Sequence, residues 1–178
     1  MIKRIKEILH KISNKQIYLI SFIVALIDQI TKSLIIHNLI LAKETVIIPN
    51  FFSLIYVTNT GAAFSSLPNK TSLLIIMSLF CLALIMTIIQ KEKNNSILKT
   101  TSLGILVGGI VGNLIDRIVH RHVIDFIAIT ILKYKFPVFN VADICITCGV
   151  FIYVIITFIE ENKIKKRCIN DKSRRRNK

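Results

Sequence analysis

The chain has 178 residues, of which 53% are hydrophobic, and its mean hydropathy is +0.62. So short a chain with so few polar residues cannot cover an apolar core with a water-facing surface, which excludes an ordinary soluble domain and predicts a membrane protein. The net charge of +14 alone would fit nucleic-acid binding. The cations gather at the two chain ends and in one short connection, however, and this distribution argues against nucleic acid as the partner.

Four apolar stretches come close to the length that a helix needs to cross a hydrocarbon core about 30 Å thick. We expect spans at Ile17–Ile36, Ser72–Ile89, Thr100–Val119 and Val141–Ile159. The first follows a basic arm, as in a secretory signal, but no small-residue cleavage site comes after it, so we expect it to stay uncleaved. The predicted fold is an all-α membrane protein with four transmembrane helices.

Lysine and arginine are concentrated in three places that four spans would put on one side of the membrane. These are an arm at residues 1–16, the connection between spans two and three, and a tail at residues 161–178, which leave 17–160 as the membrane domain. The positive-inside rule predicts that both termini are cytoplasmic and that segments at about 37–71 and 120–140 lie outside. We expect the tail to be disordered and to contact anionic lipid.

The first outer segment has β-branched and aromatic residues on both sides of a Pro49-Asn50 turn. Thr45–Ile48 and Phe51–Thr58 are therefore expected to be short strands of a small extracytoplasmic sheet on the membrane surface. They lead into the stretch Asn59-Thr60-Gly61-Ala62-Ala63-Phe64, whose small residues let the backbone approach a ligand or another helix, although an ordinary turn is the alternative.

Span three carries glycines at intervals of four residues, at Gly104, Gly108 and Gly112. Such a stripe of small residues lets a neighbouring helix pack against the backbone, and we expect close packing as its default purpose. We also expect the stripe and the apolar faces around it to help form a groove that is open to the lipid.

Charged groups inside or beside apolar spans are costly, so they are candidates for function. Asn113, Asp116 and Arg117 bring amide, carboxylate and guanidinium groups to the end of span three. In span one, Asp28 and Lys32 are four residues apart and can neutralise each other. Both sets have an anchoring alternative: an ion pair of Asp116 at the helix end, and snorkelling of Lys32 to the outer interface.

Cysteines and histidines give weak signals. A single CxxC without a second ligand pair favours the filling of apolar space over metal or redox chemistry for Cys81, Cys145, Cys148 and Cys168. The histidines lie at span ends or in loops without metalloprotease spacing, and we expect them at the membrane interface: His10, His37, His120 and His122.

Asp125 and Asp143 stand near neighbouring ends of the last two spans, and the segment between them is long enough to fold back. Like charges about 3 Å apart cannot both ionise readily, so such a pair shares one proton and supplies an acid and a base. With a water between them, the two groups could hydrolyse a peptide bond. On spacing alone, loop or cap roles remain open, including Asp143 as the cap of span four.

Five short motifs follow one another between Asp28 and Asp143: Asp28–Lys32, Asn59–Phe64, Gly108–Arg117, Val123–Phe126 and Phe136–Asp143. Together they resemble the motifs of lipoprotein signal peptidase, the bacterial type II signal peptidase. The resemblance implies an aspartic endopeptidase of the cytoplasmic membrane that cleaves diacylglyceryl-modified prolipoproteins just before the lipidated cysteine. We expect no metal, no cofactor and no nucleic-acid partner. The expected partners are prolipoproteins and membrane lipid, and the protein is expected to be a monomer.

The resemblance assigns the catalytic pair to Asp125 and Asp143. Other polar positions in the motifs would bind substrate or support the pair: Asn59, Asn113, Arg117, Asn140, Asp28 and Lys32. Two other classes remain open from the residues alone, a small proton-coupled transporter and a non-enzymatic lipoprotein-binding subunit. A proton relay needs acids spread through the membrane, whereas Asp125 and Asp143 are both expected at its outer end.

Overall fold

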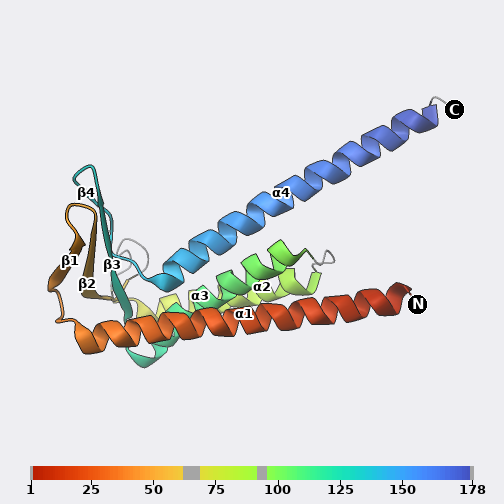
Figure 1. Ribbon diagram of the computed structural model, residues 1–178. Coiled ribbons are helices and arrows are strands. Elements are labelled where there is room, and N and C mark those ends of the chain that lie inside the picture. The colour runs from red at the N-terminus through yellow and green to blue at the C-terminus, as the bar shows by residue number, and fades with distance from the viewer. Residues whose placement is uncertain (1, 62–68, 92–95, 177–178) are drawn as a thin grey trace.

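Four helices and a small sheet make up the computed structural model in Figure 1, which describes residues 2–61, 69–91 and 96–176. The helices are α1 (Ile2–Asn38), α2 (Thr71–Lys91), α3 (Ile97–Val119) and α4 (Val141–Arg176). The strands are β1 (Glu44–Ile48), β2 (Phe52–Asn59), β3 (Val123–Ile131) and β4 (Tyr134–Lys135). They form one antiparallel sheet in the order β1-β2-β3-β4.

Each helix contains a segment long and apolar enough to cross a membrane. These segments are Asn14–Asn38, Thr71–Lys91, Ile97–Val119 and Val141–Lys163. The four predicted spans are therefore confirmed. Figure 1 shows both chain ends on the side of the molecule opposite the sheet.

The central helix is α3, and its glycines explain how closely its neighbours approach. A Cβ added to Gly108 would lie 2.6 Å from Cβ of Val24 on α1, and one added to Gly109 would lie 2.6 Å from the carbonyl oxygen of Ala142 on α4. Predicted close packing at the stripe is confirmed. The expected part of the stripe in a groove is wrong, because Gly104, Gly108 and Gly112 face α1, but other apolar positions of α3 do line a cavity, described below.

The sheet joins the two outer segments. β1 and β2 confirm the strands expected on either side of the Pro49-Asn50 turn. β3 and β4, in the second outer segment, were not predicted, because the apolar run of Val123–Ile131 lacks the alternation that marks a half-buried strand. β3 pairs with β2, with Asn59 opposite Val123 and Val57 opposite Asp125. This register brings Asn59 beside the segment that carries Asp125.

The expected disordered tail is wrong, since α4 continues as a helix to Arg176. Residues 160–176 contain neither proline nor glycine, and several are good helix formers, so nothing in the tail stops the helix begun in span four. The first helix likewise begins at Ile2 and includes the basic arm.

Candidate active site

Asp125 lies on β3, where its side chain is only 4% exposed. Its Oδ2 accepts a hydrogen bond of 2.9 Å from Asn59 Nδ2, and its Oδ1 accepts one of 2.7 Å from Asn140 Nδ2. Burial raises the pKa of Asp125 to about 6, and the nearby charge of Asp143 adds to the rise, while Asn59, Asn140 and Lys32 oppose it. This carboxyl therefore holds a proton at a higher pH than an ordinary aspartate does, up to about pH 6.

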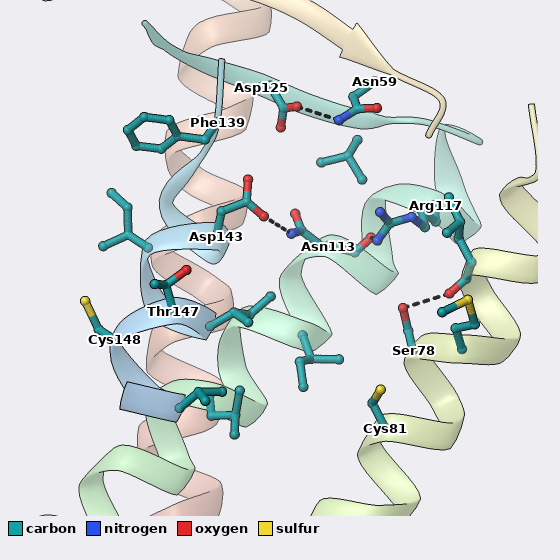
Figure 2. Close-up of a pocket in the computed structure, with 18 of the residues that line it drawn as sticks. Asn59, Ser78, Cys81, Asn113, Arg117, Asp125, Phe139, Asp143, Thr147 and Cys148 are labelled. Carbon is teal, nitrogen blue, oxygen red and sulfur yellow. Dashed lines mark hydrogen bonds between the residues drawn. The ribbon is translucent and has the colours of Figure 1, made fainter. Parts of the chain in front are cut away.

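Asp143 lies in the first turn of α4, and Figure 2 shows it beside Asn113, below the strand that carries Asp125. Its backbone N–H donates to Asn140 Oδ1 at 3.0 Å, and its Oδ2 accepts from the backbone N–H of Asn140 at 3.2 Å. This reciprocal arrangement is a capping box with Asn and Asp in the two capping positions. The capping role considered for Asp143 is thus present, and the cap also fixes the direction of its carboxylate.

Asn140 connects the two acids. It is fully buried, and its Nδ2 lies within hydrogen-bonding distance of Asp125 Oδ1 at 2.7 Å, Asn113 Oδ1 at 3.1 Å and the Ile124 carbonyl oxygen at 3.3 Å. Its side-chain oxygen and backbone N–H bond to Asp143. One side chain therefore sets the positions of both acids.

Asn113 contacts Asp143 from α3. Its Nδ2 donates to Asp143 Oδ1 at 2.8 Å, and its Oδ1 accepts from Lys32 Nζ at 2.9 Å. Asn113 therefore links the acid on α4 to the charged residues on α1.

Lys32 is the centre of a buried charge cluster. Its Nζ lies 2.8 Å from Asp28 Oδ2 and 2.9 Å from Asp116 Oδ2, and its side chain is 1% exposed. Snorkelling of Lys32 is therefore wrong, because these two carboxylates and Asn113 satisfy its ammonium in the interior. Asp28 Oδ1 also accepts from the Ala142 N–H at 2.9 Å, and Asp116 Oδ2 from the Ile124 N–H at 3.1 Å.

Asp116 was considered as a functional candidate with an anchoring ion pair as the alternative, and Gln29 was given no role. The ion pair expected of Asp116 is present, but it joins α1 and α3 in the interior and supports the start of β3. Gln29 donates to Asp116 Oδ1 at 2.8 Å and to the Gly112 carbonyl oxygen at 3.1 Å. The signal for Asp116 was its spacing of three residues from Asn113, whereas Gln29 had no signal beyond its place in a motif.

Arg117 contacts the same region from the end of α3. Its guanidinium donates to the carbonyl oxygen of Gly61 at 3.4 Å and to that of Asn113 at 3.5 Å. It also interacts electrostatically with Asp143 and Asp125. Gly61 belongs to the small-residue stretch after β2, while residues 62–64 of that stretch lie outside the described part of the chain.

An apolar cavity of about 1030 Å³ lies beneath the acids, between α2, α3 and α4. Asn59, Asn113, Arg117, Asp125 and Asp143 form its polar end, and in Figure 2 they surround the space from different elements. Its apolar walls include Met77, Leu84, Ile110, Phe139, Ile144 and Val150. The cavity can therefore take an apolar chain beside the two carboxyl groups.

Cysteines and histidines lie outside the polar network. Cys81 and Cys148 line the cavity wall, and Cys81, Cys145 and Cys148 are free thiols. His120 and His122 stand with ring centroids 5.9 Å apart in the turn after α3, and His37 is exposed near the end of α1. Cys168 and His10 have side chains outside the described residues. Within the described residues, no cluster of three or more metal-ligating side chains occurs.

All eight predicted site residues belong to one connected set of contacts. Asn59 and Asn140 bond Asp125, Asn113 and Asn140 bond Asp143, and Lys32 connects Asn113 to Asp28. Arg117 joins through its bond to Asn113. Residues from α1, β2, α3, β3 and α4 thus form one network, and those from β2, α3, β3 and α4 line the polar end of the cavity.

Known proteins share this arrangement of elements. The family model described as "Signal peptidase (SPase) II" matches residues 20–159. A lipoprotein signal peptidase of Symbiobacterium thermophilum is 39% identical over 144 residues, which are 81% of this chain and 95% of the relative, and one of Listeria monocytogenes is 34% identical over 148 residues, 83% and 96%.

Solved structures agree with the sequence matches. A bacterial membrane enzyme solved by the in meso method at 2.3 Å resolution superposes with a TM-score of 0.75 at 31% identity, over 83% of this chain and 89% of that one. A second, at 1.9 Å resolution, gives a TM-score of 0.71 at 31% identity, over 78% and 90%. The chain belongs to the signal peptidase II family and is a multi-pass bacterial membrane peptidase.

Proposed function

We propose that this chain is an aspartic endopeptidase that removes signal peptides from diacylglyceryl-modified prolipoproteins, with Asp125 and Asp143 as its catalytic pair. One observation carries the proposal: the single buried side chain of Asn140 contacts both acids at the polar end of an apolar cavity. The relatives are named lipoprotein signal peptidases, which supports a lipoprotein precursor as the substrate.

The chemistry follows from two carboxyl groups that share one proton. The ionised carboxylate takes a proton from a water, and the oxygen of that water attacks the carbonyl carbon before the lipidated cysteine. The protonated carboxyl donates to the carbonyl oxygen as negative charge develops there. Collapse of the tetrahedral intermediate breaks the C–N bond, and the new amine of the cysteine takes up a proton from the pair. Arg117 and Asn113 are the nearby donors that stabilise the developing charge.

The cavity fits the lipid part of this substrate. Transfer of an acyl chain onto an apolar wall stabilises the complex by up to about 0.8 kcal/mol per CH₂, and by less here because the chain leaves lipid rather than water. The peptide would enter between helices while the diacylglyceryl group stays against lipid and the cavity wall. Product release is then expected to be slow.

The positive-inside pattern supports an orientation with both termini in the cytoplasm and the acids at the outer face. We place the peptidase domain at 17–160, with a basic arm at 1–16 and a basic tail at 161–178 on either side. The protein is proposed to act as a monomer, without metal or cofactor.

Purified full-length protein in detergent, given a diacylglyceryl-modified prolipoprotein peptide, tests the proposal. Asp125→Asn and Asp143→Asn should each lower kcat by about 10³-fold or more, because each removes a group that transfers a proton. Glu44→Gln is the matched control, since Glu44 is a half-exposed carboxylate of the same sheet, 3.8 Å from Lys135.

Cleavage at the parent rate by both variants would refute the catalytic pair. A transporter or a binding subunit would leave the peptide intact even with the unmodified chain. A chelator should not change the rate, and a loss that added metal reverses would contradict the proposed mechanism.

A further inference from the structure

We propose that Lys32 positions the amide of Asn113 and thereby makes Asp143 the ionised member of the pair and Asp125 the member that carries the proton. This assignment rests on the proposed function and adds the roles of the two acids to it. Lys32 is a positioning residue, because it does not line the cavity and contacts neither Asp125 nor Asp143 directly.

The first step is the orientation of Asn113. The ammonium of Lys32 can donate three hydrogen bonds and can accept none. Three oxygens around it accept these bonds: Asp28 at 2.8 Å, Asp116 at 2.9 Å and Asn113 Oδ1 at 2.9 Å. A flipped amide would bring the NH₂ group of Asn113 against this ammonium, donor against donor. The amide oxygen must therefore face Lys32.

The second step is the effect on Asp143. With its oxygen held by Lys32, Asn113 can present only its NH₂ group to Asp143 Oδ1, at 2.8 Å. An amide nitrogen is a donor only, so the bond favours a carboxylate that accepts. The backbone N–H of Asn140 donates to the other oxygen, and the N-terminus of α4 adds a favourable partial charge.

The third step is the contrast with Asp125. Asp125 also accepts two hydrogen bonds, from Asn59 and Asn140, so the number of donors does not separate the acids, but the Asn140 NH₂ group has two protons for three acceptors and that donor is shared. Asp125 is nearly fully buried on a strand, whereas Asp143 is half-buried at a helix N-terminus. The single proton of the pair is therefore more stable on Asp125. The charged groups around the pair come from α1 and α3: Lys32, Asp28, Asp116 and Arg117.

The pH profile of kcat/KM tests the inference, with Lys32→Met as the variant. Its acid limb, where Asp143 takes up a proton, should move about one unit toward higher pH, a tenfold loss at a fixed acidic pH. Lys99→Met is the matched control, because Lys99 is also buried and paired, 2.8 Å from Glu160 near the other end of α3. Both variants should lose stability, but only Lys32→Met should move the limb.

A double-mutant cycle separates positioning from the bare charge of Lys32. Asn113→Ala alone should move the acid limb, and Lys32→Met should add nothing in that background. Asn113→Asp keeps an oxygen toward Lys32 but removes the donor to Asp143, so it should move the limb in a protein that still folds. Equal shifts from Lys32→Met with and without Asn113 would show that the charge alone acts, which overturns the inference.

A spectroscopic readout does not depend on activity. The chain has five aspartates, so the carboxyl ¹³C signals of labelled protein can be assigned with Asp125→Asn and Asp143→Asn. During acidification, the Asp143 carboxyl signal should change at a higher pH in Lys32→Met than in the wild type. An unchanged Asp143 signal overturns the role of Lys32, whereas the proposed function fails only if the unmodified enzyme does not cleave the peptide.

Discussion

Two of the helices that pack against α3, α1 and α2, differ in how they are attached to it. α1 meets α3 through glycines, a buried ion-pair cluster around Lys32, and the bond from the Ser21 hydroxyl to the Gly104 carbonyl oxygen at 3.1 Å. α2 is apolar on all sides, and its buried residues are Leu74, Ile85 and Ile89. Its remaining surface faces the cavity or the outside of the bundle.

The difference separates two tasks. Carboxyl chemistry needs donors held within a few tenths of an ångström, and the α1–α3 contact supplies them through Lys32 and Asn113. A lipid-bearing substrate needs a cavity whose side chains can change conformation. Apolar side chains without hydrogen bonds can do so at a small cost in free energy. If the proposed function is right, the polar contact positions the two catalytic acids, and the apolar contact shapes the space for the substrate.

The largest effect is expected from a change to the α1–α3 contact. In Gly108→Val the new side chain would meet Val24 and the Ser21 carbonyl oxygen, both under 3 Å from the added Cβ. Overpacking of this kind costs about 3 kcal/mol, which corresponds to about 6–12 °C in Tm for a chain of this size. Thermal unfolding in detergent measures it.

Ala83→Leu on α2 is the matched control, since it adds the same number of carbons at an exposed position. It should leave Tm unchanged. Equal losses from both variants would mean that α2 is held as tightly as α1, and the contrast between the helices would fail.

The second effect is the pH dependence of activity, which depends on the proton on Asp125. Because burial raises the pKa of Asp125 to about 6, a mechanism that needs its proton should lose activity as pH rises above that value. We expect log kcat/KM to fall with a slope of −1, about tenfold per pH unit. Asn59→Ala removes a donor that lowers this pKa, so its falling limb should lie at higher pH. A flat profile between pH 5 and 8 would contradict a proton on Asp125.

Much of this arrangement was predictable from local patterns. Span lengths and apolar content predicted the four helices, and β-branched residues around Pro49-Asn50 predicted β1 and β2. Motif resemblance selected the eight site residues, which do lie in one network. These signals are local in the chain, so no tertiary information was needed.

What could not be predicted depends on contacts between distant segments. β3 is a strand because it pairs with β2, some 70 residues earlier in the chain, and Lys32 is buried because Asp116 and Asn113 come from another helix. The position of the cavity depends on which face of α3 packs against α1. The spacing of the glycines does not predict which helix packs against them. Pairing and helix rotation are tertiary properties that the sequence pattern leaves open.

The smallest effect is expected from the apolar wall. Met77 on α2 lines the cavity and is half exposed, so Met77→Trp should fill space that the acyl chains need and raise KM about tenfold, a loss of about 1.4 kcal/mol of binding. Ile76→Trp is the matched control on the same helix, because Ile76 is 63% exposed and does not line the cavity. kcat and Tm should change little in either variant, since α2 has no polar contact with the acids among the described bonds. If Met77→Trp instead lowered kcat with KM unchanged, α2 would be helping to position the acids, and the division of tasks between the two helices would be wrong.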